Sequence, residues 1–221
     1  MINLHNNYIS SGADIITTNT FRTNPTSFSI IDLNITNYEF VNRSVNLAKI
    51  ACEWRNNLFV AASNPPAEDS YQFERMLSYK QIEYNHRDHI DMLWDSGCDF
   101  ILNETQSHFD EIKIICQHCS KNKIPFIISL FITPDLNILS GDNFEEIFNF
   151  IILHSPIAIG INCGSGHYND TDIHEGISPA EYGNIVKESF NLNPFFVGSC
   201  CGSSPLHTKA VKDAIYAEKN N

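Results

Sequence analysis

The chain alternates short apolar runs with longer stretches in which apolar side chains recur every three or four positions. The short runs have the length and composition of parallel strands that are covered on both faces. They predict strands over residues 14–18, 58–62, 100–102, 126–131, 157–162 and 195–198.

The longer stretches predict helices between these strands. Their repeating apolar positions are Val41, Val45, Ala48 and Cys52, then Ile82, Ile90 and Leu93, then Phe109, Ile112, Ile115 and Cys119, and then Phe144, Ile147, Phe148 and Ile151. Two later helices have marked starts. Ser178-Pro179-Ala180-Glu181 offers a capping serine, a first-turn proline and a glutamate that can reach back, and Ser204-Pro205 opens the last helix.

Strands that alternate with single helices form right-handed βαβ units, which build a parallel sheet. A closed barrel and an open doubly wound sheet both fit this order. The Gly-x-Gly-x-x-Gly turn of dinucleotide-binding sheets follows none of the early strands. The distinctive polar and thiol residues stand at strand ends, where barrel enzymes hold their active sites. We therefore predict an α/β protein of the (β/α)8 TIM-barrel type, with a single domain over residues 1–221.

Composition narrows the possible partners. The 14 basic and 26 acidic residues give a net charge of −12, which repels nucleic acid. No apolar run approaches the ~18–20 residues of a membrane span, and the start lacks a signal peptide's basic and apolar regions. We expect a cytoplasmic protein whose seven cysteines are thiols or metal ligands rather than disulfides.

Three cysteines follow predicted strands near the end of the chain. Cys200 and Cys201 are adjacent and run into a glycine-containing turn, and Cys163 follows the preceding strand. Adjacent cysteines rarely bond to each other, but in a turn both sulfurs can face one ion. Three thiolates with an open fourth position are typical of a catalytic Zn²⁺ site. The alternative, which stays open, is that they are buried apolar cysteines.

Other candidate residues have plainer interpretations. Cys116 and Cys119 have Cys-x-x-Cys spacing but fall inside a helix, so we expect Cys119 to belong to the core, as Cys52 and Cys98 do. His86 and His89 are predicted to lie on a solvated helix face. Asn64-Pro65-Pro66 is predicted to be a rigid loop that ends the second strand.

Four ordered segments resemble the homocysteine S-methyltransferase family over nearly the whole chain, from about residue 8 to residue 215. Residues 12–21, Gly-Ala-Asp-Ile-Ile-Thr-Thr-Asn-Thr-Phe, resemble the family's second-strand signature, and residues 97–105 resemble its fourth-strand motif. Residues 160–163 and 198–205 resemble its two zinc-ligand motifs. Ser199 stands where the family usually has glycine.

The resemblance implies an eight-stranded barrel in which Zn²⁺ on Cys163, Cys200 and Cys201 binds homocysteine and a methyl group is transferred to its sulfur. It also implies that Glu104 holds the ammonium group of homocysteine, and that Asn19 and Asn162 line the pocket near the metal. Two alternatives remain at this stage: Glu104 caps the next helix, and Asn19 only makes a turn.

Two departures from the family bear on the fold. The resemblance begins in the helix before the family's second strand, and only 36 residues separate Cys163 from Cys200. We therefore expect the first and seventh strands to be missing, about two βα units. Strand number, tilt and shear are linked in a barrel, so such a sheet stays open or re-pairs. Open edges make self-association possible.

The resemblance leaves more than one functional hypothesis. The first is methyl transfer to homocysteine, giving methionine. Without a cobalamin or folate module, S-methylmethionine or a similar sulfonium is the favoured donor over betaine. The second is a non-catalytic zinc-binding remnant of such an enzyme. A thiol-based redox protein is disfavoured, because Cys200 and Cys201 lack Cys-x-x-Cys geometry.

Overall fold

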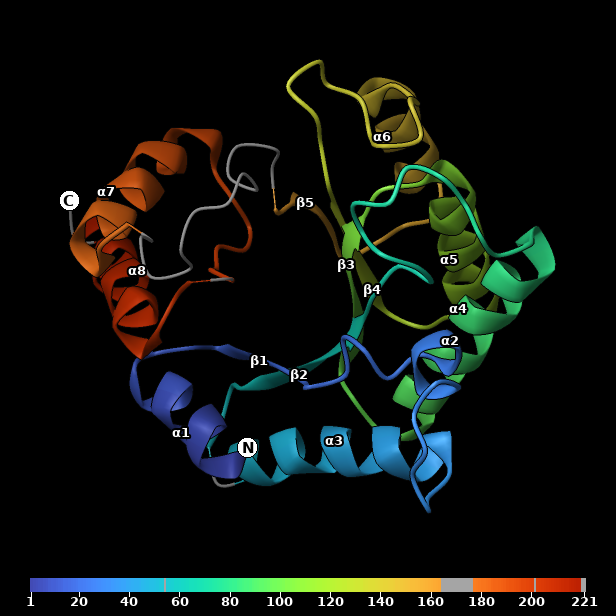
Figure 1. The fold of residues 1–221 in the computed structure, drawn as a ribbon. Helices are drawn as coiled ribbons and strands as arrows, with labels where there is room; N and C mark the ends of the chain where they lie inside the picture. Colours follow the sequence, from blue (N-terminus) through green and yellow to red (C-terminus); the bar gives the residue numbers. More distant parts are fainter. Residues whose placement is uncertain (54, 164–176, 201, 220–221) are drawn as a thin grey trace.

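The computed structural model of the chain describes residues 1–53, 55–163, 177–200 and 202–219. Helices and strands alternate through most of its length (Figure 1). The helices are α1 (Ile2–Ser10), α2 (Pro25–Phe28), α3 (Asn37–Cys52), α4 (Tyr79–Asp95), α5 (Phe109–Asn122), α6 (Phe144–Ile152), α7 (Pro179–Ser189), a 3-10 turn η1 (Phe190–Leu192) and α8 (Pro205–Lys219). The strands are β1 (Ile15–Thr17), β2 (Phe59–Asn64), β3 (Phe100–Gln106), β4 (Phe126–Leu130) and β5 (Ala158–Ile161).

The strands form one five-stranded parallel sheet in the order β1-β2-β3-β4-β5. The sheet curves like part of a barrel wall with the helices outside it, and β5 and β1 do not pair (Figure 1). The prediction of an α/β barrel-like parallel sheet is confirmed, and the sheet is open rather than closed.

The prediction of a sixth strand over residues 195–198 is wrong. This segment follows η1 without joining the sheet, and Phe195 is 78% exposed. A strand needs a neighbour to complete its backbone hydrogen bonds. Among the described residues, β1 and β5 each pair with one strand only, and neither extends the sheet to this segment.

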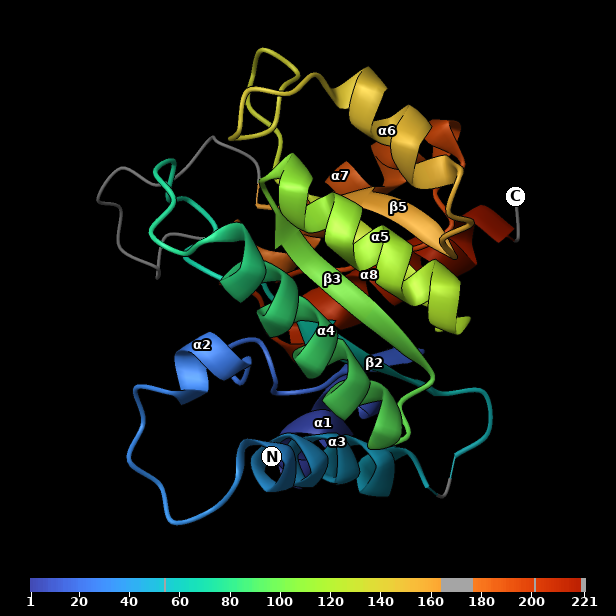
Figure 2. The ribbon, with the colours of Figure 1, turned by 90° about the vertical axis from the view of Figure 1, so that its right-hand side faces the viewer.

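Helices α3 to α6 begin and end close to where the apolar periodicity places them. Threonine and serine cap α3 and α7 in full capping boxes, Thr36 with Glu39 and Ser178 with Glu181. Helices α4 and α5 cover the outer face of β3 (Figure 2). The main apolar core lies between this outer layer and the sheet, and it includes Cys119, Cys116 and Cys98, with Cys52 half-buried against it. A smaller buried cluster consists of Ala61, Phe100 and Ile127, which come from three neighbouring strands.

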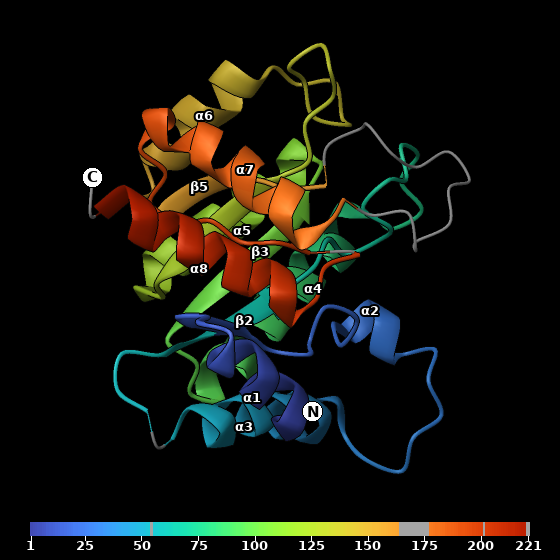
Figure 3. The same cartoon turned by 90° about the vertical axis from the view of Figure 1, so that its left-hand side faces the viewer.

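Helices α7 and α8 pack side by side on the flank where the sheet is open (Figure 3). Helix α8 reaches the other end of the chain, because Lys212 pairs with Asp14 just before β1 at 2.7 Å. Gly12 has φ +101°, and a side-chain carbon there would lie 2.8 Å from Lys212 Cγ. The close contact between α8 and the turn before β1 therefore depends on glycine.

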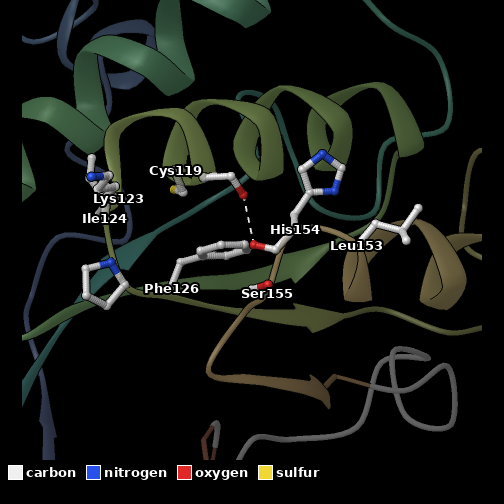
Figure 4. A pocket seen from close by; sticks show the side chains of 9 residues that line it. Cys119, Lys123, Ile124, Phe126, Leu153, His154 and Ser155 are labelled. Atoms are coloured by element: carbon white, nitrogen blue, oxygen red, sulfur yellow. Dashed lines mark hydrogen bonds between the residues drawn. The ribbon is translucent and has the colours of Figure 1, made fainter.

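A pocket of about 350 Å³ opens at the amino ends of β4 and β5 (Figure 4). Residues of the α5–β4 and α6–β5 connections line it, and Ser120 Oγ donates to the His154 carbonyl at 2.8 Å. In a barrel-like sheet this end usually serves stability, whereas chemistry takes place at the carboxyl ends. Among the described residues, no helix is long and apolar enough to cross a membrane.

Candidate active site

Two of the predicted zinc ligands meet at the carboxyl edge of the sheet. Cys163 follows the end of β5, and Cys200 lies in the segment before α8, which passes between α7, α8 and the sheet (Figure 1). Their sulfur atoms are 3.9 Å apart. This is too long for a disulfide. Two thiolates on one tetrahedral zinc, each at ~2.3 Å, stand about 3.8 Å apart, so the separation fits shared coordination of one ion.

The third predicted ligand, Cys201, lies outside the described residues. Within the part of the chain that is described, no group of three or more His, Cys, Asp or Glu side chains is placed to hold a metal ion. The pair Cys163 and Cys200 is therefore the described portion of the candidate site.

Helices α7 and α8 hold the segment that carries Cys200. The Tyr182 hydroxyl of α7 donates to the Gly198 carbonyl. At the start of α8, His207 Nδ1 accepts from the Ser204 N–H at 3.0 Å, and Nε2 donates to the Ile177 carbonyl at 2.9 Å. Burial raises the pKa of the Tyr182 hydroxyl, and the nearby Cys200 raises it further. Sequence reasoning missed Tyr182, because an isolated tyrosine in a helix carries no signal of its long-range partner.

Glu104 lies near the carboxyl end of β3. Burial raises the pKa of its carboxyl, negative charge at Cys163 adds to the rise, and the Ser63 hydroxyl offsets part of it. Among the ion pairs of the described residues, none involves Glu104. Helix α5 has His108 at its N-cap, so capping of that helix is not the role of Glu104. The carboxyl is thus a half-buried acid close to Cys163 that forms no ion pair with another described residue.

The two predicted asparagines differ in their surroundings. Asn162 lies between β5 and Cys163 and is half-buried in hydrogen bonds. Asn19 lies beyond the carboxyl end of β1 and is exposed. Both stand at the same edge of the sheet as Glu104, since all strands run parallel. The structure brings Asn162, Cys163, Cys200 and Glu104 together.

The prediction that His86 and His89 lie on a solvated helix face is wrong, because both side chains are 0% exposed. Asn64 at the end of β2 joins them. Its side-chain N–H donates to His86 Nδ1 at 3.3 Å, and its oxygen accepts from His89 Nδ1 at 2.8 Å. The same amide donates to Asn103 of β3 at 2.7 Å. Burial lowers the pKa of His89 to about 3. The polar face of α4 therefore packs against polar strand ends instead of water.

Glu111 of α5 completes this buried network. Its carboxylate accepts from His86 Nε2 and from the Ala67 N–H at 2.6 Å, and it pairs with Arg75 at 2.5 Å. Burial would raise the pKa of Glu111, but the hydrogen bond from His86 and the Arg75 guanidinium outweigh burial and lower it to about 2. The network joins the ends of β2 and β3, the strands that carry Ser63 and Glu104, through Asn64 and Asn103.

We expect Glu111→Gln to lower the free energy of unfolding by about 3–5 kcal/mol. The substitution removes the negative charge that the buried partners of the carboxylate are paired with. Asp110→Asn is the matched control. Asp110 pairs with the same Arg75 at 2.9 Å but its side chain is 39% exposed, so its loss should cost less than about 1 kcal/mol. Urea unfolding of both variants checks this, and equal losses would contradict the assigned role of the network.

Residues 1–175 match the sequence profile of the homocysteine S-methyltransferases. The chain belongs to this family. The match ends before Cys200, so the pairing of Cys200 with Cys163 rests on the structure. Membership of this family supports methyl transfer to a thiol as the reaction.

Relatives and solved structures agree with the family assignment. Selenocysteine Se-methyltransferase of Brassica oleracea var. italica is 21% identical over 98% of this chain and 79% of its own length. Crystal structures of the homocysteine methyltransferase MmuM from Escherichia coli share the fold at 19% identity, over 96% of this chain and 83% of theirs. The TM-score is 0.79 for the metallated form and 0.83 for the oxidised form. The chain thus spans about four fifths of the length of these proteins.

Proposed function

We propose that this chain binds Zn²⁺ through Cys163, Cys200 and Cys201 and transfers a methyl group from a sulfonium donor such as S-methylmethionine to homocysteine, giving methionine. The observation that carries the proposal is the 3.9 Å separation of the Cys163 and Cys200 sulfurs, which is close to the ~3.8 Å between two thiolates on one tetrahedral zinc. A metallated form of a structural neighbour supports the presence of a metal.

Bound zinc would supply the charge that deprotonates the substrate thiol, whose ordinary pKa of ~8.5 leaves it mostly protonated at neutral pH. The chain's own residues then bind and orient. Glu104 offers its carboxylate to the ammonium group of homocysteine, and Asn19 and Asn162 line the rim of the pocket. Attack of the thiolate on the donor's methyl carbon forms one carbon–sulfur bond and breaks another, and the donor leaves as a neutral thioether.

Charge favours a cationic donor. Three thiolates on one divalent ion carry a formal charge of −1, and Glu104 lies beside them. The whole chain has a net charge of −12. A sulfonium is drawn into such a site, and it becomes neutral when it gives up its methyl group.

The experiment is titration of homocysteine into zinc-loaded and zinc-free protein by calorimetry. We expect Glu104→Ala to weaken homocysteine binding by about 2–5 kcal/mol without loss of zinc, because the substrate ammonium loses a desolvated partner. Glu146→Ala is the control, since Glu146 is exposed on α6. Unchanged affinity in Glu104→Ala would make this residue structural, and no zinc-dependent binding in the parent would overturn the proposal.

A second candidate function follows from the open sheet. Within the described residues, β5 and β1 lack a second neighbour. A zinc-binding, non-catalytic remnant of a methyltransferase would keep the cysteine site and lose the geometry needed for turnover. It predicts zinc and homocysteine binding without methionine formation.

A further inference from the structure

Strand β3 contains a bulge beside the candidate site. Its pairing with β4 passes from Asn103↔Ile128 to Gln106↔Leu130, so β3 advances three residues while β4 advances two. The extra residue of the bulge therefore lies in the Glu104–Thr105 segment, between these two pairings. Thr105 has φ +54°, a left-handed conformation that is unusual for a β-branched residue. Bulges of this kind redirect side chains and are common next to active sites.

Asn162 reaches from the end of β5 across β4 to this bulge. Its side-chain oxygen accepts from the Thr105 N–H at 3.2 Å and from Ser129 Oγ at 2.8 Å. Its side-chain nitrogen donates to Thr105 Oγ1 at 2.8 Å and to Cys163 Sγ at 3.6 Å. All four hydrogen-bonding positions of the amide are occupied by groups of the protein. The side chain therefore ties three strand ends together.

These contacts converge on the sulfur of Cys163. Thr105 Oγ1 accepts from Asn162, and it directs its single proton to Cys163 Sγ at 3.9 Å. Cys163 itself has φ +52°. The amide of Asn162 thus hydrogen-bonds to two left-handed residues, Thr105 in β3 and Cys163 just beyond β5. Such conformations persist only where the surroundings hold them, and they gather at functional sites.

We propose that Thr105 and Asn162 are positioning residues that orient Cys163 for the metal; this rests on the proposed zinc function. Both donate hydrogen bonds to the sulfur. A thiolate that receives them is fixed in direction and carries less negative charge, which matters where three thiolates share one ion. Partners that orient metal ligands are typically worth 10–100-fold in metal affinity.

The test compares zinc affinity, by chelator competition, in Thr105→Val, Thr105→Ser and Thr18→Val. Thr105→Val keeps the branched shape and removes the hydroxyl, so we expect binding about 10–100-fold weaker. Thr105→Ser restores the hydroxyl and should stay within about 3-fold of the parent. Thr18→Val is the control: it removes a buried hydroxyl at another strand end, where it contacts Ser63 and Thr20. In cobalt-substituted Thr105→Val, the sulfur-to-metal charge-transfer band should shift to longer wavelength, because the sulfur loses a donor.

Asn162→Asp provides a second variant in case Thr105→Val does not fold. The variant keeps the oxygen that accepts hydrogen bonds from Thr105 and Ser129, but it removes the N–H group that donates to Cys163. Zinc affinity should therefore again fall at least 10-fold. Zinc affinity in Thr105→Val or Asn162→Asp equal to the parent's would overturn the positioning role and leave the proposed function standing. Absence of zinc binding in the parent would overturn both. Equal weakening in Thr18→Val would show that loss of stability, rather than orientation of Cys163, is responsible.

Discussion

Cys163→Ser is expected to weaken zinc binding by more than about 100-fold, the upper limit of what loss of a ligand's supporting partner costs. A site with three protein ligands cannot spare one. Cys200→Ser and Cys201→Ser should have the same effect, because each would remove a thiolate from the same ion. The measurement is zinc content by elemental analysis after gel filtration, followed by chelator competition.

The controls are Cys119→Ser and Cys52→Ser. Cys119 is buried in α5, and Cys52 is half-buried at the end of α3. Burial raises the pKa of both thiols, so neither is prepared to act as a thiolate. Zinc content per folded chain should be unchanged in both. Equal zinc loss in all variants, or none in the parent, would show that the assigned cysteines are not the ligands.

The second large effect is on turnover. We expect the 221-residue chain to convert homocysteine and S-methylmethionine to methionine at least about 100-fold more slowly than the E. coli homocysteine methyltransferase does under the same conditions. Methyl transfer needs the two sulfurs and the methyl carbon in line, and a misplacement of about 1 Å costs roughly that factor. Here the sheet is open between β5 and β1, and Cys200 is held by helices rather than by a strand.

Methionine formation per bound zinc, measured by mass spectrometry, decides this prediction. Cys163→Ser protein supplies the background rate. Turnover comparable to that of the E. coli enzyme would show that five paired strands position the reactants well enough. Zinc and homocysteine binding with background turnover would instead favour the non-catalytic remnant over the enzyme.

The sequence determined most of the elements and the positions of most candidate site residues. Apolar periodicity predicted α3 to α6, because the buried face of a helix places an apolar residue at every third or fourth position. Five of the six predicted strands form for a similar reason: each is a short apolar run between two helices. The motifs located Glu104, Asn162 and Cys163 at strand ends, and parallel strands place their carboxyl ends at one edge.

Tertiary structure decided the features that depend on distant partners. The run at residues 195–198 is as apolar as a strand, yet it joins no sheet, because a strand requires a neighbour as well as a pattern. His86 and His89 are polar and were predicted to meet water. They are buried because Asn64, Glu111 and Thr23 supply their hydrogen bonds from other elements. Composition within the helix contains no information about those partners.

The candidate ligands and the contacts that orient them differ in the same way. A Cys–Cys pair and a third cysteine at a strand end are visible in the sequence. The bulge in β3, the left-handed Thr105 and the four hydrogen bonds of Asn162 are not, because each depends on the register between β3, β4 and β5. Register comes from how whole strands pack. The sequence alone therefore identified the cysteines that we propose as metal ligands, and only the packed sheet decided how Cys163 is oriented.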